Sequence, residues 1–231
     1  MNIVYPPLIL LSMLSTFLPC FYGSLLLKKE LPAYRLLWAF FLFAVIAECA
    51  LFVLSSFKYP TQWIFKLYTA VEYVLISLVL ARWHQKKAIS KLISSSIFLY
   101  LAIFALIEFV LLGQSATGKI NHISRGIALL LLSASVFLTL NDIWSRAADS
   151  LTKDFRFWML MAMALYYCSS LVPIVFMFAE DWEFLKALFQ IHAPFNILHN
   201  LVFCVGIYIG RKYGMPPTRP PGLLYFDLPD E

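Results

Sequence analysis

The amino-acid sequence predicts an all-α, polytopic membrane protein, a bundle of seven transmembrane helices with its N-terminus outside and its C-terminus in the cytoplasm. Three observations support this prediction: the composition, the lengths of the apolar runs and the placement of the basic residues. Of the 231 residues, 61% are hydrophobic and 13% are charged, whereas soluble proteins contain about 25% charged residues. A soluble chain of this size could not bury so much apolar surface, so we expect lipid to be its solvent.

Seven apolar runs follow one another along the chain, each near the roughly 20 residues that cross about 30 Å of hydrocarbon. The predicted spans are 8–27, 36–57, 64–82, 92–112, 126–145, 157–178 and 187–210. Residues 1–212 therefore form the predicted transmembrane domain. The segment 213–231 is rich in proline, and we expect it to be an extended cytoplasmic tail.

The orientation follows from the lysines and arginines between the spans, because cytoplasmic loops carry the excess of these residues. Four basic residues fall on the predicted outer side: Lys58, Lys119, Arg125 and Lys186. Thirteen fall on the predicted inner side: Lys28, Lys29, Arg35, Arg82, Lys86, Lys87, Lys91, Arg146, Lys153, Arg156, Arg211, Lys212 and Arg219. Lys66 lies inside the third span and is counted on neither side. We therefore expect a multi-pass protein of the plasma (cytoplasmic) membrane.

The same distribution argues against a nucleic-acid partner, although the formal net charge is +5. The expected partners are membrane lipid, a small-molecule ligand and, through the basic loops and the tail, a cytoplasmic protein. The four cysteines lie inside apolar runs without metal-type spacing, and we interpret them as buried, unpaired thiols. They are Cys20, Cys49, Cys168 and Cys204. We expect no cofactor and no metal site.

The last span carries the most polar residues. His192, Asn196, His199 and Asn200 are spaced i, i+4, i+7 and i+8, so they share one face of a helix. In hydrocarbon such a face must look inward, toward other helices or trapped water. We therefore expect this face to form part of a polar interior.

Other polar residues fall at the same depth as Asn196. Counted inward from the outer end of each span, Glu48, Glu72, Ser169 and Ser170 all lie about 12–14 Å below the boundary. Tyr68 shares a helix face with Glu72. The predicted ligand-binding residues are Glu48, Tyr68, Glu72, Ser169, Ser170, His192, Asn196, His199 and Asn200.

An ionised carboxylate at this depth costs roughly 2.5–3.5 kcal/mol or more. No lysine or arginine side chain is expected at this level. Lys66 lies in the third span, but its side chain can extend outward to the interface. We therefore expect at least one of Glu48 and Glu72 to be neutral. The alternative role of the polar residues is purely structural, as hydrogen bonds between helices. Of the other acids, Glu108 is expected at the interface, and Asp142 is expected to pair with Arg146 four residues later.

Two segments resemble a group of uncharacterised bacterial seven-helix membrane proteins. They are YTAVEYVLIS in the third span, with Tyr68 and Glu72, and FNILHN in the seventh, with Asn196 and Asn200. These proteins have no assigned activity, so the resemblance implies the seven-span architecture and no substrate.

Three functions remain open. The preferred one is a membrane sensor or ligand-binding protein with a polar pocket in the outer half of the bundle. A proton- or cation-coupled transporter using Glu48 and Glu72 is the alternative, and an intramembrane enzyme is the third. The seventh span has no lysine that could bind retinal, and no GxSxG or phosphate-binding loop is present. An enzyme is therefore the least favoured of the three.

Overall fold

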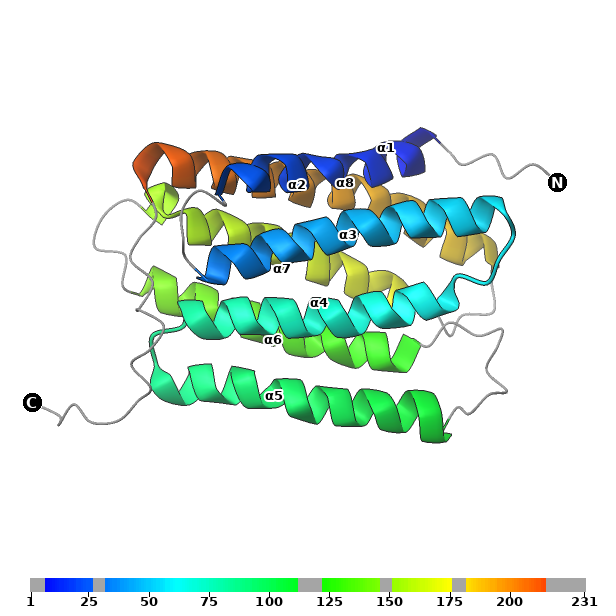
Figure 1. Cartoon of the computed structure of the whole chain (residues 1–231), viewed down its shortest axis with the longest axis horizontal. Coiled ribbons are helices and arrows are strands. Elements are labelled where there is room, and N and C mark those ends of the chain that lie inside the picture. Colours follow the sequence, from blue (N-terminus) through cyan, green and yellow to red (C-terminus); the bar gives the residue numbers. More distant parts are fainter. Residues whose placement is uncertain (1–6, 27–31, 112–121, 146–150, 176–181, 215–231) are drawn as a thin grey trace, which may run out of the picture.

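The computed structural model describes residues 7–26, 32–111, 122–145, 151–175 and 182–214, and these residues are all helical or in short connections. Figure 1 shows the helices running side by side along one axis. The elements are α1 (Pro7–Ser15), α2 (Phe17–Gly23), η1 (Ser24–Leu26), α3 (Pro32–Ser56), α4 (Gln62–Trp83), α5 (Lys87–Ala105), the π-helical η2 (Leu106–Leu111), α6 (His122–Trp144), η4 (Leu151–Lys153), α7 (Phe155–Val175) and α8 (Trp182–Tyr213).

Six helices in the described part of the chain, α3 to α8, are long and apolar enough to cross a membrane. These six helices indicate a multi-pass membrane protein. The first predicted span is different, because it forms the short helices α1 and α2 instead of one long helix. The break lies at Thr16, three residues before Pro19. Proline has no backbone N–H and its ring clashes with the carbonyl four residues earlier, so a helix passing through Pro19 loses a bond at this point.

The helices form two layers (Figure 1). One layer contains α1 and α2, α3 and α4, and the other contains α8, α7 and α6. Contacts between α1, α2 and α8 join the layers along one edge, and contacts between α4 and α6 join them along the other. Helix α5 packs outside this second edge. We call the two ends of the bundle the α3–α4 end and the α4–α5 end, after the connections found there.

The turn from α3 to α4 shows how the local sequence ends a helix. Lys58 has a positive φ of 59°, its N–H donates to the Ser55 carbonyl, and the N–H of Tyr59 donates to the Leu54 carbonyl. This pair of bonds is the Schellman arrangement that closes a helix C-terminus. Pro60 follows immediately, and α4 begins two residues later. The chain therefore reverses direction within a few residues, which makes α3 and α4 antiparallel neighbours.

Large side chains fill the α4–α5 end. The Phe155 ring is fully buried, with its centroid 4.8 Å from that of Tyr34 and 5.6 Å from that of Trp83. Helix α8 approaches α7 closely there, because Gly206 and Gly210 face it without side chains. A Cβ on Gly210 would lie 3.2 Å from the Phe155 Cβ. Two small residues four positions apart, as Gly206 and Gly210 are, are typical of close helix packing in membranes.

The cysteines of the described residues are free thiols. The prediction that all four are buried is wrong, because Cys20 and Cys204 are only partly buried and Cys49 and Cys168 are exposed on the surface of the bundle. In a membrane protein this surface faces lipid, so exposure costs an apolar thiol little. The predicted tail lies largely outside the described residues, which end at Gly214.

Candidate ligand-binding cavity

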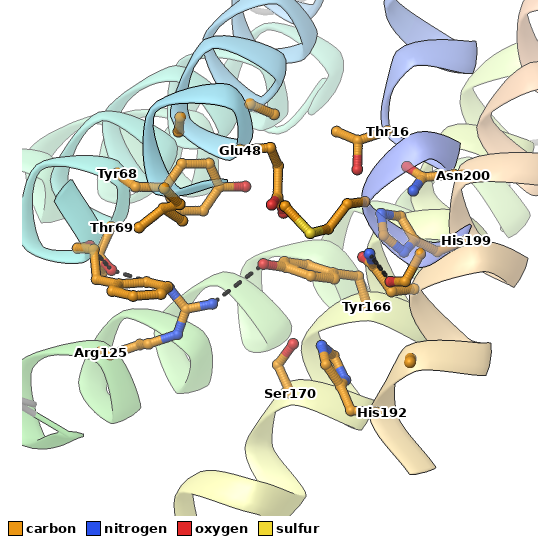
Figure 2. Close-up of a pocket in the computed structure, with 18 of the residues that line it drawn as sticks. Thr16, Glu48, Tyr68, Thr69, Arg125, Tyr166, Ser170, His192, His199 and Asn200 are labelled. Atoms are coloured by element: carbon orange, nitrogen blue, oxygen red, sulfur yellow. Dashed lines mark hydrogen bonds between the residues drawn. The ribbon is translucent and has the colours of Figure 1, made fainter. Parts of the chain in front are cut away.

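The two layers separate at the α3–α4 end and leave a cavity of about 530 Å³. This volume lies within the range of about 300–1,000 Å³ that is usual for small-molecule sites. Much of the wall is apolar and comes from side chains such as Phe40, Phe41, Leu51, Phe65, Met163 and Phe203. Polar side chains from α1, α3, α4, α6, α7 and α8, and Thr16 between α1 and α2, interrupt this wall (Figure 2).

Arg125 enters the cavity from the first turns of α6 (Figure 2). Its Nη1 donates to the Thr69 hydroxyl of α4 at 3.1 Å, and its Nη2 donates to the Tyr166 hydroxyl of α7 at 3.2 Å. The guanidinium also lies 6.0 Å from the centre of the Tyr68 ring. The expectation that no arginine lies in the polar layer is therefore wrong. Helix α6 begins at His122, before the predicted start at 126, so Arg125 belongs to the helix and not to a loop.

Glu48 lies on α3 and points into the cavity (Figure 2). Its carboxylate makes no hydrogen bond or salt bridge within the described part of the chain. It is attracted electrostatically by Arg125 from the other layer. The cavity therefore contains a carboxylate and a guanidinium that are not paired directly with each other. Both groups have hydrogen-bonding capacity available to a third molecule.

Glu72 was predicted to line the site but does not line the cavity. It is 1% exposed, lies among the buried residues of α4 and interacts with Tyr68 and Arg125. Its Oε1 atom has no hydrogen-bond partner among the described residues. Tyr68 is the neighbour that faces the cavity. Glu72 therefore supports the cavity wall from behind.

Helices α7 and α8 supply the aromatic and imidazole part of the wall. The Tyr166 ring centre lies 4.8 Å from the His199 ring centre and 6.1 Å from that of His192. The Nδ1 atoms of both histidines and the Ser170 hydroxyl have no hydrogen-bond partner in the described structure. All four residues line the cavity. The predicted placement of the polar α8 face toward the interior is therefore confirmed.

Two predicted residues connect α8 to α1. The Asn196 amide donates to the Ser12 hydroxyl at 2.7 Å, and the Asn200 amide donates to the Ser15 hydroxyl at 2.8 Å. Both asparagines line the cavity, but these amide groups serve first to hold two helices together. The structural alternative considered for the asparagines is thus observed here.

Ser169 does not face the cavity. Its hydroxyl donates to the Tyr166 carbonyl at 3.0 Å, a bond within its own helix. It lines an apolar groove between α7 and α8. His192 and Pro173 line both this groove and the cavity, so only a thin wall separates the two spaces.

Two other acids have partners that the sequence did not indicate. Glu108 was expected at the interface, but it is buried, accepts a hydrogen bond from Ser124 and lies 2.6 Å from the Lys66 ammonium. Lys66 therefore pairs with an acid and does not extend freely outward. Asp142 accepts the Gln85 N–H at 3.1 Å, at the end of α4. Its predicted partner Arg146 lies outside the described residues.

Sequence reasoning missed Arg125, Tyr166 and Thr69. Span limits set by hydropathy place a cation near a helix end in the loop, and tyrosine and threonine are too common in membrane helices to stand out. The available signal was the position of Arg125 directly before the apolar run predicted at 126–145.

No group of three or more His, Cys, Asp or Glu side chains that could hold a metal occurs among the described residues.

No family model, curated protein or solved structure matches the chain. The resemblance to bacterial seven-helix proteins therefore stays an expectation.

Proposed function

We propose that this chain is an integral membrane sensor or ligand-binding protein, and that its ligand is a small amphiphilic molecule held in the cavity. With the orientation predicted from the basic residues, the α3–α4 end faces outside and the cavity lies in the outer half of the bundle. The ligand then comes from the exterior or from the outer leaflet. The basic cytoplasmic loops and the tail would meet an intracellular partner or anionic lipid.

One observation supports this proposal most strongly: a cavity of about 530 Å³ combines an apolar wall with polar groups that lack hydrogen-bond partners among the residues that the structure describes. Polar side chains are costly in hydrocarbon and are rare there without a function. An empty space also loses dispersion contacts that close packing would supply. A bundle that only had to span the membrane would gain stability by filling this space.

A cavity-filling variant tests the proposal. Ala44 lies on α3, is buried and lines the cavity, so Ala44→Trp places an indole inside it. Ile46 lies two residues later and is exposed on the lipid-facing side, which makes Ile46→Trp a matched control. We expect a panel of amphiphiles to raise the Tm of the wild type and of Ile46→Trp but not of Ala44→Trp. Equal responses from all three proteins would contradict the proposal.

The second candidate function is proton- or cation-coupled transport. It is favoured by the buried Glu72, whose Oε1 has no hydrogen-bond partner in the described part of the chain, and by Glu48 in the cavity. Intramembrane acids commonly serve in such relays. Flux measurements in proteoliposomes distinguish the two functions. If the protein is a transporter, the wild type should support a proton-driven flux and Glu72→Gln should abolish it. If it only binds a ligand, neither the wild type nor Glu72→Gln should support a flux.

A further inference from the structure

We infer that the ligand of this cavity is a zwitterionic amphiphile, whose acidic group binds Arg125 and whose cationic group binds Glu48. This inference rests on the proposed function and adds the chemical class of the ligand. It follows from three features of the cavity: the incomplete bonding of Arg125 and the unpaired carboxylate of Glu48, both judged among the described residues, and the apolar remainder of the wall.

Arg125 is held in place by neutral partners. Its two hydrogen bonds go to the hydroxyls of Thr69 and Tyr166, and no carboxylate lies within salt-bridge distance of it in the described part of the chain. A guanidinium has five N–H donors in a fixed fork. Fixing the fork with two hydroxyls orients it and leaves donors for a planar or tetrahedral anion. Carboxylate and phosphate are the anions that this geometry binds best.

Glu72 does not satisfy Arg125, although it attracts it electrostatically. Glu72 lies behind the cavity wall, and the Tyr68 ring stands at the wall itself. An anion inside the cavity would therefore reach the exposed side of the guanidinium without displacing Glu72. The Tyr166 hydroxyl would remain as a neighbouring donor.

Glu48 decides between an acid and a zwitterion. A purely anionic ligand would meet this carboxylate in a low-dielectric space, where repulsion is strong. A purely cationic ligand would meet Arg125 in the same way. A molecule that carries both charges satisfies both groups and brings no net charge into the membrane interior. His192 and His199 also face the cavity, and their Nδ1 atoms have no hydrogen-bond partner among the described residues.

The rest of the wall selects for an apolar portion. Aromatic, aliphatic and thioether side chains line the cavity beyond the charged groups, among them Phe40, Met163 and Phe203. Contacts of this kind favour alkyl or aromatic ligand groups. The ligand therefore combines a zwitterionic head with an apolar tail.

Four probes that share one decyl chain test the charges separately. They are decylphosphocholine, decyl phosphate, decyltrimethylammonium and 1-decanol, titrated calorimetrically below their micellar concentrations into protein held in an uncharged maltoside detergent. The Ala44→Trp variant, with its filled cavity, supplies the correction for partition into the detergent. We expect decylphosphocholine to bind about 10-fold or more tightly than decanol, since one charge-assisted hydrogen bond raises the affinity by about 10-fold or more.

Single variants should then separate the two charges. Arg125→Gln should weaken the two phosphate-bearing probes by about 10-fold or more and leave decyltrimethylammonium unchanged, with Arg125→Lys intermediate. Glu48→Gln should weaken the two ammonium-bearing probes and leave decyl phosphate unchanged or improved. Arg125→Lys keeps the charge, so it remains informative if Arg125→Gln fails to fold.

Three results would overturn the inference. Saturable and equal binding of all four probes, lost in Ala44→Trp, would leave the proposed function standing and remove the charge recognition. Binding of decyl phosphate as tight as decylphosphocholine, unaffected by Glu48→Gln, would replace the zwitterion with an acid. If none of the four probes binds saturably, both the proposed function and the inference are contradicted.

Discussion

The two ends of the bundle solve the same packing problem in different ways. At the α4–α5 end, bulky aromatic rings and two glycines bring α3, α4, α7 and α8 into close contact. At the α3–α4 end, the layers stand apart around a cavity, and side-chain hydrogen bonds join α1 to α8 and α6 to α4 and α7. The closely packed end can hold the helices together, so that the other end can leave space for a ligand. Stability and binding should therefore be separable by mutation.

The largest expected effect is at Phe155, which is fully buried at the α4–α5 end. Phe155→Ala should lower the free energy of unfolding by about 3 kcal/mol, the lower end of the range for buried aromatic residues. Phe65→Ala is the comparison at the α3–α4 end, because Phe65 lines the cavity and is 38% exposed. Phe65→Ala should lower the free energy of unfolding by less than about 1 kcal/mol. Equilibrium unfolding by dodecyl sulfate in mixed micelles measures both, and equal losses would contradict the contrast between the ends.

Adding bulk at the same closely packed end should have the next largest effect. A Cβ at Gly206 would lie 3.1 Å from the Cβ of Trp158 and 3.1 Å from the Cε of Met159. Gly206→Leu should therefore separate α7 from α8 and cost about 1–3 kcal/mol. Val205→Leu adds bulk on the exposed side of the same helix and should be nearly neutral. The two variants are compared by their Tm values in the same detergent, and similar values would refute close packing at Gly206.

At the α3–α4 end, loss of the hydrogen bond from Arg125 to Tyr166 should have a smaller effect on stability. Tyr166→Phe removes the acceptor of one guanidinium N–H, and a hydrogen bond to a charged group contributes about 1.5 kcal/mol or more. Tyr167→Phe is the control, because Tyr167 also lines the cavity and makes no hydrogen bond to Arg125. We expect Tyr166→Phe to lower both the stability and the affinity for phosphate-bearing probes. A loss of stability equal to that of the control would argue against the bond.

The smallest effects should come from the bonds between α1 and α8. Ser15→Ala and Asn200→Ala each break the bond between these residues. Interhelical hydrogen bonds in membranes average about 0.6 kcal/mol. A double-mutant cycle should return a coupling energy of about that size. A coupling indistinguishable from zero would mean that α1 is held to α8 by apolar contacts alone.

The helices and one face of the site could be predicted from the sequence. Hydropathy and length identified α3 to α8, because a helix in lipid must satisfy its own backbone and present an apolar surface. Helical spacing placed His192, His199 and their neighbours on one inward face. The limits of the helices were less predictable: α6 starts at His122, before the apolar run predicted from residue 126, and this extension brings Arg125 into the cavity.

The sequence by itself determined the helical class and the segments that are long and apolar enough to cross a membrane, together with the alignment of polar residues on α8. These follow from local periodicity and from the cost of polar groups in hydrocarbon. Only the tertiary structure decided which polar groups face the cavity, which pair with each other and which support it from behind. It placed Arg125 beside Thr69 and Tyr166, joined Asn196 and Asn200 to α1, and moved Glu72 behind Tyr68. These outcomes depend on the rotation of each helix against its neighbours, which is set by packing between residues far apart in the chain.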